Sequence, residues 1–463
     1  MLQSYQQASH YRRGKDFAHR NAQSMGTTIC HSWYSEMQIS STRLKAAKWR
    51  YSGRAWPTVV FQRTPANPSI GNQQEINMSE PTLQLEDIHG RQAYTLENGR
   101  LHVSALRGGG HLVDIRLLTD NPQAAINPFY VPNYPTIDPH TYTADQHAAL
   151  YGEGANARLT AGYMGHLLCF PTFGPPTPDE IANGFTFHGE AVAVEWRQHR
   201  PPHITPEAIT LYYGADLVQT QYRVERAITL HANQTNVHVE EWIENLADFD
   251  RPFNRDQHPT FGAPFVAPGK TMLDLPGTKG VIKAGRNAGG GLPIGEVIWP
   301  YAIQPDGTQA DLRAFQATPA STTYYPILLD PARPMSYFTL YNVDYPLLVG
   351  YLFPTADNPW IVDWQENKSN QQPPANGQMI ARGIEFGTSP WDEGLRKSID
   401  RGSMFDTPTY QWIGGRQRIK TTYTIFLTEI PVGFRGVADV QAQAGQIVIT
   451  ERETGRQISI ANG

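Results

Sequence analysis

The stretch QYRVERAITLHANQTNVHVEEWIENL (residues 221–246) alternates apolar and polar side chains on both sides of the turn-forming segment HANQTN. Ile228 and Leu230 precede the turn, and Val237 and Val239 follow it. Because successive side chains of an extended chain point to opposite faces, alternation of period two indicates a strand with one buried face. The stretch therefore predicts two strands paired as an antiparallel hairpin.

The same alternation recurs through most of the chain. It is present in GRLHVSAL, MSYFTLYNVDYPLLVGYLF, TTYTIFLTEI and QIVITERETGRQISIANG. The 40 Gly and 36 Pro residues favour many turns between short strands. Only Ala144–Tyr151 predicts a short helix, and no repeat of fixed period indicates a propeller. The predicted fold class is all-β, a large antiparallel β-sandwich.

The first 77 residues differ in charge from the rest. They contain ten Lys or Arg residues against Asp16, Glu36 and Glu75, a net charge of +7, while the whole chain carries −5. They also lack sustained periodicity, and MSEPTLQLEDIHG from Met78 is typical of a new beginning. We expect residues 1–77 to be a disordered or non-native N-terminal leader and residues 78–463 to be the sandwich domain. A basic tail that binds an acidic partner is the alternative.

Composition excludes several classes of protein. Charged residues make up 17% of the 463 residues, without a tail acidic or basic enough to imply nucleic acid as a partner. Cys30 and Cys169 lie too far apart in the sequence to suggest a disulfide framework or a thiolate metal site. Neither a membrane span nor the apolar region of a signal peptide is evident, so we expect a cytoplasmic protein without membrane partners.

The segment RDQHPTFGAPF (residues 255–265) combines a histidine with residues that disturb regular structure. Pro259 lacks a backbone donor and Gly262 loosens the chain, so the segment predicts a loop or strand end that carries His258. Loops held by a rigid scaffold often carry chemistry. A histidine hydrogen-bonded in a structural turn is the alternative.

Four stretches occur in a distinctive order along the chain: ENGRLHVSALRGGGHLVDIRL, GHLLCFPTFGPPTPDEIANGFTFHGEA, ITLHANQTNVHVEEWIENLADFDRPFNRDQHPTFG and GQMIARGIEFGTSPWDEG. Their order and spacing resemble the aldose 1-epimerase (galactose mutarotase-like) superfamily. The resemblance extends from residue 83 to about residue 430 and is carried by order and spacing rather than by one motif. It implies a β-sandwich that binds a sugar, in a divergent and poorly characterised member.

The resemblance implies two catalytic residues. His258 matches the histidine that protonates the ring oxygen, and Glu385 matches the glutamate that takes the proton from the C1 hydroxyl. We expect them on the concave face of the sandwich, with room for one pyranose ring between them. His188 matches a histidine that positions the substrate.

Further substrate contacts are predicted nearby. Arg255 and Asp256 are expected to orient His258 or to contact sugar hydroxyls. Tyr130 and Tyr134 offer aromatic rings for stacking, although their Pro-rich segment is equally typical of a clamp on the sandwich surface. An additional carboxylate is used by some members of the superfamily, and Asp363 and Glu366 are the candidates for it.

The sequence departs from the family pattern after His188. Glu190, Ala191 and Val192 follow the His-Gly pair where Phe-Ala-Arg is common, which removes a donor to substrate hydroxyls. The identity of the sugar is therefore left open, as is the oligomeric state.

The predicted function is an isomerase that interconverts sugar anomers by acid and base catalysis of ring opening. A non-catalytic carbohydrate-binding module, or a glycan lyase or hydrolase that uses the same cleft, is the alternative. No cofactor is expected. No metal is expected either, because no H-x-H or H-x-x-x-H spacing occurs on one element. GTSPW is not the G-x-S-x-G motif of a serine hydrolase.

Overall fold

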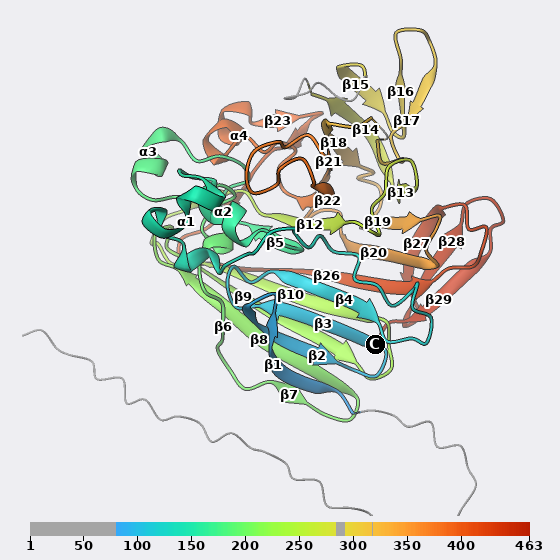
Figure 1. Cartoon of the computed structure of the whole chain (residues 1–463), viewed down its shortest axis with the longest axis horizontal. Helices are drawn as coiled ribbons and strands as arrows, with labels where there is room; N and C mark the ends of the chain where they lie inside the picture. Colours follow the sequence, from blue (N-terminus) through green and yellow to red (C-terminus); the bar gives the residue numbers. More distant parts are fainter. Residues whose placement is uncertain (1–79, 284–291, 317) are drawn as a thin grey trace, which may run out of the picture. The chain divides into compact units, whose positions relative to one another are not determined.

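In the computed structural model, two large antiparallel sheets form the fold (Figure 1). The structure describes residues 80–283, 292–316 and 318–463, which belong to one compact unit, Gln73–Gly463. Within these ranges one sheet has thirteen strands and the other has nine. The predicted all-β sandwich is confirmed. The predicted leader, residues 1–77, lies outside the described residues.

The strands of the thirteen-stranded sheet come from both halves of the chain. In spatial order they are β1 (Thr82–Ile88), β2 (Arg91–Glu97), β3 (Leu101–Leu106), β4 (Leu112–Leu117), β5 (His166–Cys169), β12 (Asp256–Gly262), β22 (Ile380–Gly387), β21 (Trp360–Asn367), β18 (Ser321–Leu329), β14 (Gly277–Ile282), β15 (Gly295–Ile298), β16 (Tyr301–Ile303) and β17 (Gln309–Asp311).

The nine-stranded sheet contains the hairpin predicted from residues 221–246. Its strands in spatial order are β13 (Thr271–Asp274), β19 (Met335–Asn342), β20 (Leu347–Pro354), β26 (Arg418–Glu429), β10 (Asn236–Asn245), β9 (Tyr222–His231), β8 (Ala208–Leu217) and β6 (Arg197–Gln198), with β7 (His203–Ile204) also paired to β8. Ile228 and Val239 lie opposite each other in the hairpin register, and both are buried.

Smaller sheets and short helices complete the described ranges. The remaining strands are β11 (Arg251–Phe253), β23 (Ser403–Met404), β24 (Thr407–Pro408), β25 (Gln411–Ile413), β27 (Val437–Gln443), β28 (Gln446–Glu451) and β29 (Gln457–Ala461). The helices are η1 (Pro139–Thr141), α1 (Ala144–Tyr151), α2 (Ala157–Gly162), α3 (Pro178–Ala182), η2 (Ala191–Ala193) and α4 (Leu395–Arg401). The predicted helix Ala144–Tyr151 is confirmed. Among the described residues, no helix has the length and apolarity needed to cross a membrane.

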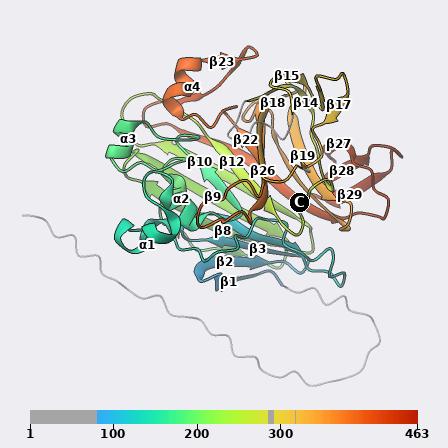
Figure 2. The same ribbon diagram turned by 45° about the horizontal axis from the view of Figure 1, so that its top comes forward.

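The C-terminal hairpin is confirmed as β28 and β29, but it lies outside the two large sheets. With β27 it forms a three-stranded sheet beside β19 (Figure 2) and β20 (Figure 1). Val437 and Val440 of β27 pack in one apolar cluster with Tyr337 of β19 and Leu352 of β20. This sheet therefore covers the part formed by β19, β20 and β26 on the face of the nine-stranded sheet that is turned away from the main core.

The main core lies between the two large sheets. Phe386 of β22 stacks on Phe353 of β20 with ring centroids 4.3 Å apart. Phe261 and Phe265 are both 0% exposed in this core. Each fully buried aromatic side chain contributes about 1.5–3 kcal/mol relative to an exposed one. Packing across this interface therefore holds β12 and β22, which carry the candidate site.

A buried ion pair also joins neighbouring strands on the core side. Arg382 of β22 and Asp363 of β21 both have fully buried side chains, with Nη2 and Oδ2 2.6 Å apart. Tyr325 donates a second hydrogen bond to Oδ2 of Asp363 at 2.7 Å, and Gln365 donates a third at 3.0 Å. The charges are thus paired and hydrogen-bonded, as burial requires.

The prediction of a loop or strand end at residues 255–265 is wrong, because β12 is a strand between β5 and β22. Its register with β22 pairs Gln257 with Phe386 and resumes at Thr260. Pro259 lies in this interruption, so its missing N–H removes no hydrogen bond to β22. Proline in a central strand is unusual, and the gap in the ladder is what accommodates it.

Candidate active site

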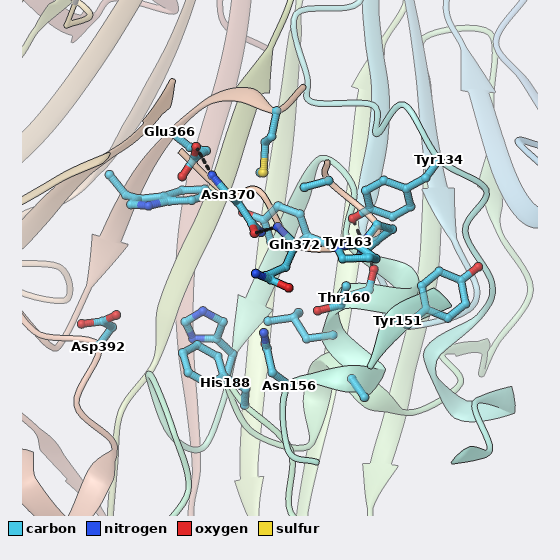
Figure 3. A pocket seen from close by; sticks show the side chains of 18 of the residues that line it. Tyr134, Tyr151, Asn156, Thr160, Tyr163, His188, Glu366, Asn370, Gln372 and Asp392 are labelled. Atoms are coloured by element: carbon cyan, nitrogen blue, oxygen red, sulfur yellow. Dashed lines mark hydrogen bonds between the residues drawn. The ribbon is translucent and has the colours of Figure 1, made fainter. Parts of the chain in front are cut away.

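A cavity of about 470 Å³ lies over β12, β21 and β22. It is on the face of the thirteen-stranded sheet that is turned away from the main core, where α2 packs against β5 through Leu159 and Leu167. Further lining comes from the chain around α1 and α2, from the loop of residues 368–379 between β21 and β22, and from single positions that include His188 and Asp392 (Figure 3). Regular strands thus form one side of the cavity, and connecting segments form the others.

Strand alternation brings His258 and Glu385 to this face together. Their neighbours in sequence, Gln257 and Phe386, pair across β12 and β22 and point toward the core side. His258 and Glu385 therefore project into the cavity from adjacent strands. His258 Nε2 lies 3.1 Å from Oε1 of Glu385.

This distance corrects one expectation. A pyranose ring cannot lie between two side chains that are already in hydrogen-bonding contact. A sugar can instead present one edge to both of them, because the ring oxygen and the hydroxyl oxygen are bonded to the same carbon. The two oxygens of that edge are closer together than the two side-chain atoms.

The second ring nitrogen of His258 is held by a chain of hydroxyl groups. Nδ1 lies 3.0 Å from Oγ1 of Thr260, and this oxygen lies 2.8 Å from the hydroxyl of Tyr163. Thr260 also points into the site from β12, two residues after His258. These contacts fix the orientation of the imidazole, and the hydroxyl of Thr260 serves either tautomer as donor or acceptor.

Burial favours the uncharged form of both catalytic candidates. It raises the pKa of Glu385 well above its ordinary value, and the nearby carboxylates of Asp392 and Asp256 raise that pKa further. Burial lowers the pKa of His258. The pair therefore holds one transferable proton between a carboxyl group and a neutral imidazole. Oε2 of Glu385 is buried and has no hydrogen-bond partner among the described residues, which leaves it for a ligand.

His188 lines the cavity in an unusual backbone conformation. Its φ of 64° is in the left-handed region, where residues other than glycine are uncommon. Nδ1 accepts a hydrogen bond from the backbone N–H of Gly174 at 3.1 Å, so Nε2 carries the proton of the neutral ring. Burial lowers the pKa of His188 and keeps the ring neutral. Its ring centroid is 5.3 Å from that of His258.

Three predicted substrate contacts do not line the cavity, which corrects those expectations. Arg255 donates hydrogen bonds to the carbonyl of Asp357 and the side chain of Asn358. Asp256 is buried and accepts a hydrogen bond from the backbone of Ser389. Tyr130 is buried behind the cavity against Tyr163, so its segment packs as a clamp at this residue. Each of these three side chains contacts other parts of the protein and is not directed into the cavity.

The two candidates for a further carboxylate lie on opposite faces of the sheet. Glu366 lines the cavity, whereas Asp363 points into the core and pairs with Arg382. Glu366, near the end of β21, accepts hydrogen bonds from the backbone N–H and the hydroxyl of Ser369, and so fixes the start of the loop of residues 368–379. Asp392 also lines the cavity and was not predicted, because nothing in its local sequence marks it.

Other lining residues were missed as well. Trp364 of β21 lies edge-on to His258 with ring centroids 6.1 Å apart, and Asn156 and Gln372 come from connecting segments. The alternation IVDWQEN, which places Trp364 on the same face as the predicted candidate Glu366, was the available signal for Trp364. Asn156 and Gln372 lie in irregular segments, which carry no such signal.

Glu190 explains the departure after His188. Its carboxylate accepts hydrogen bonds from the backbone N–H groups of Gln219 and Thr220 and from the hydroxyl of Thr220. The side chain therefore stabilises the turn between β8 and β9 and does not line the cavity. Among the described residues, no group of three or more His, Cys, Asp or Glu side chains is arranged to hold a metal ion.

Gly383 provides a test of how closely the pair is packed. A Cβ atom added there would lie 3.0 Å from Oε1 of Glu385 and 3.1 Å from Cε1 of His258. We expect Gly383→Ala to displace the pair and to lower kcat for the reaction proposed below by roughly 10- to 100-fold, since small misplacements of reacting groups are costly. Thermal unfolding serves as the control for folding. Unchanged kcat in a folded variant would contradict the placement of the pair.

Comparison by sequence gives no match, either to a protein-family model or to a curated protein. Solved structures do match it in fold. A Klebsiella pneumoniae protein provisionally assigned as an aldose 1-epimerase is 14% identical, with a TM-score of 0.54 over 76% of this chain and 84% of that one. A galactose mutarotase-like protein from Clostridium acetobutylicum is 12% identical, with a TM-score of 0.49 over 76% of this chain and 99% of that one.

The similarity to the Klebsiella pneumoniae protein establishes the fold. The described chain has the fold of that protein, and at 14% identity it is a divergent example of it. The resemblance drawn from the order of the four sequence stretches is confirmed at the level of the fold. What the site does must be inferred from its own residues.

Proposed function

We propose that this protein is an isomerase of the aldose 1-epimerase type, which interconverts the anomers of a sugar by opening and reclosing its ring. The observation that carries the proposal is the buried contact of 3.1 Å between His258 and Glu385 inside a cavity large enough for a sugar. Burying a carboxyl group and an imidazole costs folding free energy unless they are hydrogen-bonded. Buried titratable pairs with shifted pKa values in a cavity are typical of functional sites. The fold provides the scaffold but does not by itself imply the reaction.

The chemistry requires one proton donor and one proton acceptor on the same edge of the sugar. The donor protonates the ring oxygen as its bond to C1 breaks, and the acceptor takes the proton of the C1 hydroxyl as the carbonyl forms. Rotation about the bond from C1 to C2 and reclosure invert the anomeric carbon, and both protons return. His258 and Glu385 supply one donor and one acceptor whichever of them holds the shared proton.

His188 and Trp364 would orient the sugar. The Nε2–H of His188 is a fixed donor because Nδ1 already accepts from Gly174. Trp364 provides an aromatic surface next to His258. Together they would bind hydroxyl groups and the apolar face of the ring, the combination typical of small-ligand pockets.

The test of the proposed function measures anomer exchange directly. Polarimetry and NMR exchange spectroscopy on freshly dissolved α-anomers of a panel of aldoses should show acceleration in proportion to protein concentration. The His258→Ala variant should lose it. A folded wild-type protein that accelerates none of the panel would overturn the proposal.

The electrostatics of the pair predict an unusual pH dependence. An unperturbed imidazole titrates near pH 6.5, but burial lowers the pKa of His258 to about 3. Because the pKa of Glu385 is raised, the pair keeps its single proton as the pH rises from acidic to neutral. We expect kcat to change by less than about twofold between roughly pH 5 and 7. A rate that falls with a midpoint near pH 6.5 would contradict this protonation state.

A non-catalytic carbohydrate-binding module is the second candidate, and Val192 is the observation that favours it. Val192 occupies the position of the arginine common at the end of the family motif, and its apolar side chain is buried and offers no hydrogen-bond donor to a sugar. Equilibrium binding of aldoses without acceleration of anomer exchange would support this candidate over the isomerase.

A further inference from the structure

The cavity extends well beyond the pair of catalytic candidates. Figure 3 shows His188 and Asp392 toward one side of the pocket and Tyr134, Tyr151 and Thr160 toward the other. Its volume of about 470 Å³ is within the range of roughly 300–1,000 Å³ in which proteins hold drug-sized ligands. That is a class of ligand larger than a single sugar ring, so a ring placed at His258 and Glu385 would leave part of the cavity unfilled.

The far part of the cavity has fixed aromatic rings. The hydroxyl of Tyr134 donates to the carbonyl of Thr160 at 3.4 Å, and the hydroxyl of Tyr151 donates to the carbonyl of Pro135 at 2.9 Å. Backbone contacts therefore hold both rings in place, and both residues line the cavity. Preorganised aromatic surfaces of this kind bind ligands at low entropic cost.

Two side-chain amides lie between these ends. Asn156 is at the N-cap of α2, where an asparagine ordinarily accepts a hydrogen bond from the helix, yet its side chain makes no such bond. Gln372 uses its backbone N–H to bind Asn370, while its side chain has no hydrogen-bond partner among the described residues. Figure 3 shows the two amides pointing toward one another across the pocket.

The charge of the lining restricts the ligand. None of the described lining residues is a lysine or arginine, whereas Glu153, Glu366 and Asp392 contribute carboxyl groups. The cation beside the described lining is Lys283, whose Nζ lies 3.9 Å from Oδ1 of Asp392 and is thus already paired with a carboxylate. A phosphorylated sugar or a uronic acid would compete with Asp392 for this cation and would face the carboxyl groups of Glu153 and Glu366. Amides and aromatic rings instead suit the hydroxyl groups and apolar faces of an uncharged carbohydrate.

We propose that the cavity binds an uncharged carbohydrate of at least two residues with a free reducing end. The reducing residue lies against His258 and Glu385, and the next residue lies between Asn156 and Gln372, beside Tyr134. This inference rests on the proposed function, since the reacting anomeric carbon defines the reducing end, and it adds the size and charge of the substrate.

Binding of blocked sugars tests the second subsite without requiring a reaction. Methyl glycosides cannot change anomer, so calorimetry with the methyl glycosides of glucose, galactose, cellobiose, maltose and lactose measures recognition alone. At least one disaccharide should bind about tenfold or more tightly than its monosaccharide. Asn156→Ala and Gln372→Ala should each weaken disaccharide binding roughly three- to tenfold, the effect of one hydrogen bond, and leave monosaccharide binding unchanged.

Gln371 offers a matched control. It is adjacent to Gln372 and exposed, and its side chain donates to the carbonyl of Lys368 instead of lining the cavity. Gln371→Ala should bind both classes of ligand like the wild type. Equal affinity of the wild type for monosaccharides and disaccharides, or equal loss of both in the amide variants, would overturn the second subsite and leave the isomerase proposal intact. Absence of binding for all of these glycosides, combined with no acceleration of anomer exchange, would overturn both.

Discussion

Replacing His258 by alanine or Glu385 by glutamine is expected to lower kcat for anomer exchange by about 10²–10⁴-fold, the contribution of one proton-transfer group. Each change removes one of the two groups in the contact of 3.1 Å and leaves the sugar without a donor or an acceptor. The double variant should be little slower than either single variant, because residues that act as a unit have non-additive effects. Progress curves from polarimetry give kcat for each protein.

Matched substitutions away from the cavity control for indirect effects. His203→Ala on β7 changes an exposed histidine, and Glu240→Gln on β10 changes a surface glutamate that pairs with Lys420. Both variants should retain the wild-type rate. Full activity in either His258→Ala or Glu385→Gln would show that the pair does not carry the reaction.

The second large effect concerns stability. Asp363→Ala leaves the guanidinium of Arg382 buried without its carboxylate and removes the acceptor of Tyr325 and Gln365. Breaking a buried pair in this way costs about 3–5 kcal/mol in the free energy of unfolding. Urea denaturation followed by tryptophan fluorescence measures this difference.

The exposed pair Arg396 and Asp400 on α4 is the comparison for this effect. Its side chains are 70% and 56% exposed, so Asp400→Ala should change the free energy of unfolding by less than about 1 kcal/mol. If Asp363→Ala were equally mild, the ion pair would not be holding β21 and β22 together.

Strand patterning predicted most of the architecture because it depends on local sequence. Alternation around residues 221–246 identified both strands of the hairpin, and the few helical signals correctly gave Ala144–Tyr151. Alternation also explains why His258 and Glu385 share one face of the sheet: β12 and β22 are neighbours, and Gln257 pairs with Phe386 on the other face. That neighbourhood joins strands more than a hundred residues apart, which no local pattern specifies.

The failures have physical causes of the same kind. The strand at Pro259 was missed because proline is normally excluded from central strands. Here the pairing between β12 and β22 is interrupted at Pro259, so the strand tolerates the missing N–H. Arg255 and Asp256 have the polarity of ligand-binding residues, but their hydrogen bonds go to Asn358 and Ser389, which are distant in sequence. Asn156 and Gln372 could not be found beforehand because connecting segments have no periodicity to show which side chains face a cavity.

The origin of the cavity lining has a consequence for evolution and engineering. The proposed catalytic pair, His258 and Glu385, is on two central strands packed against the core, whereas Tyr134, Asn156 and Gln372 come from connecting segments that the sheet does not need for its pairing. Connections tolerate insertion and substitution far better than central strands. Under the proposed function, exchanging residues 134–160 or 368–379 between proteins of this fold would therefore change the substrate preference and leave the proposed reaction at β12 and β22 unchanged.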